Sequence, residues 1–497
     1  MEIVIITIYG FALLFILLYS IVQFKLVINY RIAKRRSGKK NSGHLQEQYV
    51  PDFELPTVTI QLPVYNEIYV VKRLIDTVIR IDYPPEKLEI QVLDDSNDET
   101  SAIAEKRVKE LLDQGHRICF IHRNNRRGFK AGALEEGLKI ASGEFIAIFD
   151  ADFVPPPDFL HNTLSYFENE KVGMVQTRWG HINKDYSLLT RLQAFGLDAH
   201  FSVEQKGRNA RGHFINFNGT AGIWRKKCIL DAGGWEHDTL TEDLDLSYRA
   251  QMKGWKFKYL EEVVTPAELP VVMSAVKNQQ FRWNKGGAEN FRKMIGKLIA
   301  SKQVPFRTKV HGFFHLLNSA IFLCVLTTAL LSVPLIFIKK SHPEFELVFN
   351  ISSLFLVCTF ILMVFYWNAY QENPSGSMHN FGRFFKEFVL FLATTMGLSF
   401  HNSVAVIEGY LGKKSSFVRT PKFNIMSAGD RWSGNKYLVN SINLISFIEG
   451  LLCLYFLFAI IAGIMMQEYG LLPFHLMLCW GFGFVFFHSI RNYKLKA

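Results

Sequence analysis

Long, uncharged apolar runs lie at both ends of this chain and are missing from its middle. The first run covers residues 3–24. The later runs cover residues 313–338, 347–369, 388–400, 439–466 and 471–490. A helix of about 20 apolar residues crosses the roughly 30 Å hydrocarbon layer of a bilayer. We therefore expect a membrane protein whose middle part, from residue 51 to about 301, folds in water.

A basic cluster follows the first run, with no small-residue cleavage pattern, which predicts an uncleaved anchor. The cluster consists of Arg31, Lys34, Arg35, Arg36, Lys39 and Lys40. Lys and Arg collect on the cytosolic side of a span, so the chain from residue 31 onward is expected in the cytosol. The run at 388–400 is too short to span comfortably and predicts an interfacial or re-entrant helix. The remaining runs predict five spans and a cytosolic C-terminal tail.

Basic residues outnumber acidic ones by 56 to 45, for a formal net charge of +11. Much of the excess lies beside the apolar runs and no nucleic-acid-binding module is present, so the charge indicates an anionic membrane surface and no nucleic acid. The six cysteines are far apart and form no Cys-x-x-Cys pair. This spacing is typical of packing residues in a reducing compartment, and neither a disulfide framework nor a zinc site is expected.

The middle part alternates short apolar strands with helices. The segments "TVTIQL", "LEIQVL", "RICFIH" and "EFIAIFD" predict strands, and residues 67–81, 99–112 and 128–140 predict helices. This alternation is typical of an α/β domain with a mostly parallel sheet covered on both faces. Ligands of such sheets bind beyond the carboxyl ends of the strands.

Polar residues follow three of the four predicted strands. They are Tyr65 and Glu67 after the first, Asp94 and Asp95 after the second, and Asp150 and Asp152 after the fourth. Carboxylates gathered at one edge repel each other unless a cation offsets them, and the Asp-x-Asp pair offers two oxygen ligands to a hard divalent ion holding a diphosphate. Taken singly, Asp94 and Asp95 could belong to an Asx turn, and Asp-x-Asp is a common pattern.

Two helix starts carry further charged candidates. Lys130 lies near the N-terminus of a predicted helix, where backbone N–H groups favour phosphate; a solvated lysine is the alternative. Glu242 and Asp243 begin another helix after a Gly/Thr-rich stretch. They could cap that helix, or one of them could accept the proton of an acceptor hydroxyl.

Gln279, Arg282 and Trp283 lie within "QQFRW". An arginine can stabilise a departing diphosphate, and an indole offers a flat apolar face to a sugar ring. The alternative is an interfacial Trp–Arg anchor before the next apolar run.

The ordered set "VYNE", "DDSND", "DAD", "TED" and "QQFRW", followed by several apolar runs, resembles the family-2 glycosyltransferases of the cellulose-synthase-like superfamily. It looks closest to the glucomannan/mannan synthase-like and xyloglucan-backbone synthase-like members and their bacterial relatives. The resemblance implies an α/β GT-A fold, which is Rossmann-like, and an inverting single displacement with Mg²⁺ or Mn²⁺ on the nucleotide-diphospho-sugar donor.

The same resemblance implies a role for each motif residue. Tyr65, Glu67, Asp94, Asp95 and Lys130 would hold the nucleotide and diphosphate, and Asp150 and Asp152 would hold the metal and phosphates. Asp243 would be the base with Glu242 beside it, and Gln279, Arg282 and Trp283 would form the acceptor and leaving-group end.

A basic segment further on, "VAVIEGYLGKKSSFVRTPKFN", looks like the one that bears the gating loop in processive synthases. Its candidates are Phe417, Arg419, Thr420 and Lys422. Pro421 departs from the bacterial cellulose-synthase pattern, and a membrane-surface loop is the alternative. The predicted organisation is an anchor at residues 1–30, a cytosolic GT-A domain at 50–300, and a C-terminal membrane region at 305–497 that holds the interfacial helix and the loop at 384–436.

Together these features predict a membrane-bound enzyme that passes a hexose from UDP-glucose or GDP-mannose to a growing β-glycan and feeds the chain through its own helices. A lipid glycosyltransferase that adds one sugar to ceramide or another membrane lipid carries similar motifs and is the alternative. A nucleotide-sensing scaffold without catalysis is a remote third, because Asp243 and both Asp-x-Asp carboxylates are present. The donor, the linkage, the oligomeric state and any export partner stay open.

Overall fold

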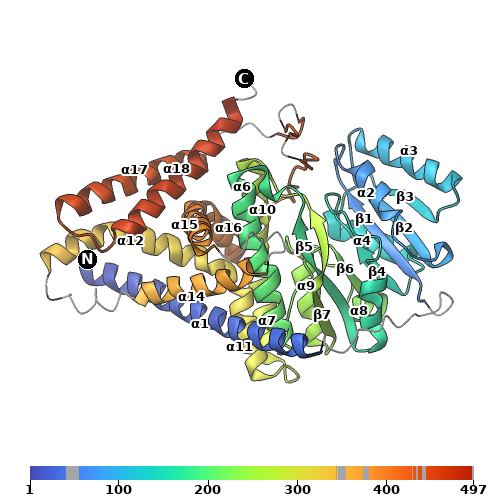
Figure 1. The fold of residues 1–497 in the computed structure, drawn as a ribbon, viewed down its shortest axis with the longest axis horizontal. Coiled ribbons are helices and arrows are strands. Elements are labelled where there is room, and N and C mark those ends of the chain that lie inside the picture. Colours follow the sequence, from blue (N-terminus) through green and yellow to red (C-terminus); the bar gives the residue numbers. More distant parts are fainter. Residues whose placement is uncertain are drawn as a thin grey trace.

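The computed structural model describes residues 1–40, 55–342, 344, 354–372, 380–427, 429–432, 435–438 and 444–494. One side of the molecule is built on a β-sheet and the other consists of long helices, with α10 (Met273–Ala300) between them (Figure 1). The N-terminal helix α1 (Glu2–Lys40) runs past residue 30, the predicted end of the anchor, and packs against α7 (Gln205–Asn209).

A seven-stranded sheet in the order β3-β2-β1-β4-β6-β5-β7 forms the centre of the α/β part. Its strands are β1 (Val58–Val64), β2 (Leu88–Asp94), β3 (Ile118–His122), β4 (Phe145–Ile148), β5 (Val172–His181), β6 (Gly222–Arg225) and β7 (Lys256–Ala267). Neighbouring strands are parallel except where β6 pairs with β4 and β5. The predicted mostly parallel sheet is confirmed, although only β1 to β4 were predicted.

Strand β6 is antiparallel because it begins where β4 ends: Gly222 pairs with Ile148, and Arg225 pairs with Phe145. The chain therefore turns back along the sheet from its carboxyl edge. This reversal places residues 218–221 beside the end of β4, where the Thr220 hydroxyl accepts a hydrogen bond from the Asp150 amide at 2.8 Å.

Apolar side chains of successive β4 residues enter two different cores, one on each face of the sheet. Phe145 and Ala147 join the core under α2 (Val71–Val78) and α3 (Thr100–Asp113). Ile146 and Ile148 join the core under α4 (Phe129–Ile140), α8 (Lys226–Asp231) and α9 (Glu242–Met252). Because strand side chains alternate between faces, a strand buried on both sides is apolar throughout. The predicted covering on both faces is therefore confirmed.

The other helices belong to the second half of the domain and to the apolar part. They are α5 (His161–Leu164), α6 (Leu188–Ala199), α11 (Phe306–Leu316), α12 (Ile321–Ser341), α14 (Leu354–Tyr370), α15 (Phe381–Gly397), α16 (Ser399–Leu411), α17 (Leu444–Met465) and α18 (Leu472–Lys494). Four stretches of the described chain are long and apolar enough to cross a membrane, within α1, α12, α17 and α18. The pair α15 and α16, bent by 50°, makes five if it counts as one span. The chain therefore has the helices of a membrane protein.

Two predicted runs differ from the observed helices. The run at 313–338 is not one helix, because the chain turns at residues 318–320 between α11 and α12, where Asn318 accepts a hydrogen bond from Tyr19 of α1. The short run at 388–400 is part of the bent pair α15–α16. The run at 347–369 is described from Leu354 onward, and its beginning lies outside the described residues.

A buried ion pair joins α10 to two of the apolar helices. The Lys277 ammonium of α10 lies 2.5 Å from the Glu449 carboxylate of α17 and donates a hydrogen bond to Ser489 of α18 at 3.0 Å. Glu449, which interrupts an apolar run, is thereby neutralised inside the protein. Buried charges in membrane helices are expensive unless they are paired, so this contact fixes α10 against α17 and α18.

Candidate active site

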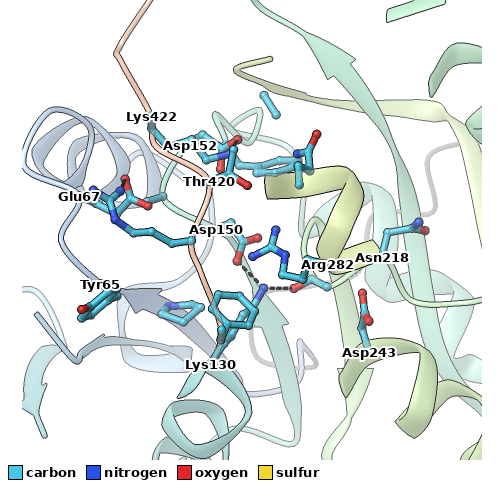
Figure 2. Close-up of a pocket in the computed structure, with 18 of the residues that line it drawn as sticks. Tyr65, Glu67, Lys130, Asp150, Asp152, Asn218, Asp243, Arg282, Thr420 and Lys422 are labelled. Atoms are coloured by element: carbon cyan, nitrogen blue, oxygen red, sulfur yellow. Dashed lines mark hydrogen bonds and ion pairs between the residues drawn. The ribbon is translucent and has the colours of Figure 1, made fainter. Parts of the chain in front are cut away.

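A cavity at the carboxyl edge of the sheet brings the separate motifs together (Figure 2). It is bordered by the ends of β1 and β4, the start of α9, the middle of α10 and the segment at residues 417–422. All the predicted site residues except Asp94 line it. They are Tyr65, Glu67, Asp95, Lys130, Asp150, Asp152, Glu242, Asp243, Gln279, Arg282, Trp283, Phe417, Arg419, Thr420 and Lys422.

The two carboxylates that follow β4 are each paired with a lysine from another element. Lys130, in the first turn of α4, lies 2.5 Å from Oδ1 of Asp150 and donates to the Gly219 carbonyl at 2.8 Å. Lys422 lies 2.5 Å from Oδ2 of Asp152. Positive charge therefore already balances both carboxylates, as their shared position at one strand end requires.

Asp243 lies in the first turn of α9, opposite the glycine that also contacts Lys130. Gly219 has a φ of +80°, and a Cβ there would lie 3.1 Å from Oδ2 of Asp243 and 3.4 Å from Nζ of Lys130. A glycine thus permits both the backbone turn and the close approach of two charged side chains. Burial, reinforced by the neighbouring Glu242 carboxylate, raises the pKa of the Asp243 carboxyl to about 7. This carboxyl can therefore take up a proton near neutral pH.

Helix α10 carries the third set of residues and packs closely on the turn before α9. A Cβ at Gly286 would lie 2.6 Å from the Thr241 side chain, and Asn290 donates to the Thr241 hydroxyl at 2.9 Å. This packing holds Arg282 at the cavity. Burial lowers the pKa of the Arg282 guanidinium, although Glu242 and the other site carboxylates act in the opposite direction. The guanidinium lies 4.5 Å from the centre of the Phe417 ring, a cation–π contact.

The segment at 417–422 crosses the cavity and contacts its other walls. The Phe417 ring stacks on Phe129 at 5.9 Å, and Nη1 of Arg419 lies 3.1 Å from Oε2 of Glu67. Just after the segment, the Glu268 carboxylate accepts the backbone N–H groups of residues 423 and 424 at 2.8 and 3.0 Å. Burial raises the pKa of the Glu67 carboxyl to about 8, although Arg419 and Lys422 lower it in part. The segment therefore covers the site in this arrangement.

The chain is similar in sequence to known glycosyltransferases. Residues 56–286 match the family described as "Glycosyltransferase like family 2". The chain is 40% identical over 323 residues to glucomannan 4-beta-mannosyltransferase 1 of Cyamopsis tetragonoloba, covering 62% of this chain and 61% of that protein. It is 36% identical over 363 residues to glucomannan 4-beta-mannosyltransferase 7 of Arabidopsis thaliana, covering 68% and 65%. The chain carries a family-2 glycosyltransferase domain.

The family-2 match begins just before β1 and ends within α10, so the glycosyltransferase domain holds every motif except the segment at 417–422. The family match and the observed sheet confirm the predicted GT-A fold followed by apolar helices. The chain spans about 61% to 65% of the length of these two relatives.

Two solved structures that match this chain share little sequence with it. The mannosyltransferase PcManGT from Pyrobaculum calidifontis, in complex with GDP-Man and Mn2+, is 20% identical with a TM-score of 0.48, over 73% of this chain and 100% of that one. S. aureus TarS is 14% identical with a TM-score of 0.36, over 71% of this chain and 54% of that one.

Asp94 is the one predicted site residue that does not line the cavity. Its carboxylate is fully buried, lies 2.7 Å from Nδ1 of His122 and accepts a hydrogen bond from Ser101. Asp95, the next residue, lines the cavity and accepts two hydrogen bonds from Arg123. Side chains alternate in direction along a strand, and Asp94, the last residue of β2, points away from the side to which Asp95 points.

Several residues of the glycosyltransferase site were not predicted. Arg126 places its guanidinium 3.3 Å from the centre of the Tyr65 ring, and Glu268 anchors the segment that covers the cavity. Asn218 and Trp179 also line the cavity. Arg126 lies four residues before Lys130, a predicted site residue, and was within reach of the sequence. Trp179 belongs to β5, a strand that was not predicted.

Proposed function

We propose that this chain is a membrane-bound inverting glycosyltransferase that transfers a hexose, here mannose, from a nucleotide-diphospho-sugar to a growing β-glycan. The observation that carries the proposal is the shared contact at Gly219. Its carbonyl binds Lys130, the partner of Asp150, while its Cα faces Asp243. The Lys130 ammonium, which would bind the diphosphate, and the Asp243 carboxylate, the candidate base, therefore both lie next to Gly219. A direct displacement at the sugar carbon requires these two groups to be held close together.

The donor half of the site suits a divalent cation and a diphosphate. Asp150 and Asp152 supply carboxylate oxygens, the ligands that Mg²⁺ and Mn²⁺ prefer. Arg419 and Thr420 each have a buried polar atom, Nη2 and Oγ1, with no hydrogen-bond partner among the described residues. Such atoms are available to phosphate oxygens. When bound, Mg²⁺ or Mn²⁺ would neutralise charge on the departing diphosphate.

In the acceptor half, Asp243 would accept the proton of the attacking hydroxyl while Arg282 stabilises the leaving group. Both side chains are labelled in Figure 2 near the Lys130–Asp150 pair. Gln279 and Trp283, on the same helix as Arg282, would hold the end of the acceptor. The relatives' names favour mannose, so GDP-mannose is the first donor to test and UDP-glucose the second.

The attachment of α10 supports a product that grows towards the membrane. This helix carries the acceptor-end residues and packs on α16 and α18, and its Lys277 is paired with Glu449 of α17. We expect the catalytic domain in the cytosol, the glycan leaving between the apolar helices, and the segment at 417–422 moving aside when donor enters.

The rate should depend on pH through Asp243. The base works only when ionised, and its pKa is raised to about 7 by burial and by Glu242. The kcat/KM for the acceptor should therefore fall as pH drops below about 7, tenfold per pH unit once Asp243 is protonated. Initial rates between pH 5.5 and 8.5 measure this limb, and a rate that stays flat to pH 5.5 would exclude Asp243 as the titrating base.

The function is tested by incubating membranes that contain the full chain with radiolabelled GDP-mannose and with UDP-glucose separately. The expected product is a high-mass, β-linked polymer from GDP-mannose, sized by gel filtration and linkage-typed. Membranes carrying the Asp243→Asn variant are the matched control and should give at least about 100-fold less polymer. A product that carries one sugar and extracts into organic solvent would show that the acceptor is a lipid and not a glycan. Absence of labelled product from both donors would overturn the proposal.

A further inference from the structure

Asn218 borders the cavity next to the candidate base but belongs to none of the motifs. It precedes Gly219, the residue that touches both Lys130 and Asp243, and Figure 2 shows its side chain on the same side of the cavity as Asp243. Its backbone N–H donates to Oε1 of Gln176 at 2.9 Å. This hydrogen bond fixes the backbone position of Asn218. The orientation of its side-chain amide then decides which atom a ligand would contact.

One end of the Asn218 amide is assigned by Gln205. Nε2 of Gln205 lies 3.0 Å from the backbone carbonyl of Asn216, which can only accept, so this atom is the donating nitrogen. The same nitrogen lies 2.6 Å from Oδ1 of Asn218. Gln205 is fully buried. The Asn218 oxygen is therefore the acceptor of this contact, and the other end of its amide is the NH₂ group.

The NH₂ end is assigned independently by His200. Nδ2 of Asn218 lies 3.1 Å from Nε2 of His200, whose Nδ1 lies 2.7 Å from the Glu204 carboxylate. That carboxylate also binds Arg208, and both members of this pair are buried. Burial alone would raise the pKa of the Glu204 carboxyl, but Arg208 brings it below its ordinary value, so Glu204 is ionised and only accepts. The ring proton then sits on Nδ1, and Nε2 accepts from Asn218.

The two assignments agree, and they leave Asn218 with one N–H to spare. Among the residues that the structure describes, its Nδ2 makes no hydrogen bond other than the one to His200. His200 and Glu204 are the ends of a π-helical turn (His200–Glu204) between α6 and α7. Such turns cost hydrogen-bond regularity and are frequent at functional sites.

We infer that Asn218 contacts the acceptor glycan by donating this N–H to a sugar oxygen, and that His200, held by Glu204, is the positioning residue that keeps the NH₂ group in place. The inference rests on the proposed function and adds an acceptor-side contact to it. A sugar hydroxyl or ring oxygen is the group that can accept this N–H, because Asn218 lines the cavity with a donor to spare.

Asn218→Asp replaces the NH₂ group by an oxygen of the same size, which cannot donate. We expect the KM for β-1,4-linked mannohexaose to rise about 10-fold, with the Kd for GDP unchanged within about threefold, because the loss is confined to the acceptor. His200→Leu removes the atom that holds the NH₂ group and should raise the same KM about threefold or more. His200→Gln places a carbonyl oxygen near the position of Nε2 and should restore a value close to that of the unmodified chain.

The measurements use the full chain in detergent, with labelled GDP-mannose as donor, initial rates over a range of mannohexaose concentrations and calorimetry for GDP. The exposed His161→Leu is the matched control. Unchanged kinetics in Asn218→Asp and His200→Leu, an equal loss of GDP affinity, or no difference between His200→Gln and His200→Leu would each overturn the inference. If Asn218→Asp does not fold, the two His200 variants decide. Failure of the unmodified chain to transfer from either donor would count against the proposed function instead.

Discussion

Asp243→Asn is expected to lower sugar transfer by roughly 100- to 10,000-fold, the range that a positioned general base contributes. Asparagine has the same shape but cannot accept the proton of the attacking hydroxyl. The nearby donor-side contact between Lys130 and Asp150 does not involve residue 243. The affinity of the variant for the nucleotide should therefore stay within about threefold of that of the unmodified chain. Only the rate of the chemical step should fall.

This prediction is checked by comparing initial rates of transfer with the Kd for GDP in the same preparation. Asp158→Asn is a suitable control, because it makes the same chemical change at an exposed aspartate outside the cavity. Turnover by Asp243→Asn within tenfold of the unmodified chain would remove Asp243 from the mechanism and leave Glu242 as the remaining carboxylate of α9 at the cavity.

Removal of divalent cations should reduce turnover by about 100-fold or more, because a metal ion contributes several kcal/mol of charge stabilisation and each 1.36 kcal/mol is tenfold in rate. Asp152→Asn should act in the same direction and raise the Mn²⁺ concentration needed for half-maximal rate. In this structure the Lys422 ammonium lies 2.5 Å from Oδ2 of Asp152, so the lysine has to move away before a cation can bind that oxygen.

The test is an EDTA-treated preparation titrated with Mg²⁺ and with Mn²⁺. A second acidic group, Glu236, Asp238 and Asp245, offers a matched control because Lys293 already lies 2.5 to 2.8 Å from all three carboxylates. Asp238→Asn should leave the metal titration unchanged. Full turnover in EDTA would contradict a metal-assisted reaction.

The layout of the molecule and most of the candidate site follow from local patterns in the amino-acid sequence. Apolar runs near the length of a bilayer predicted the long helices α1, α12, α17 and α18, because only such runs can be buried in lipid. The alternation of strands and helices predicted β1 to β4, and the rule that parallel strands end at one edge brought Asp95 and Asp150 to one cavity. These features are local in the chain.

Other features depend on contacts between distant segments and became visible only in the folded chain. The tertiary structure separated Asp94 from Asp95, showed that β6 runs against its neighbours, and placed Lys422 on Asp152, 270 residues away. The short strand β6 is hydrogen-bonded on both sides, so its direction comes from its partners and not from its own four residues. The side-chain amide of Asn218 is likewise oriented by Gln205 and His200. Hydrogen bonds between side chains of a helix and a loop cannot be predicted from the spacing of residues in the sequence.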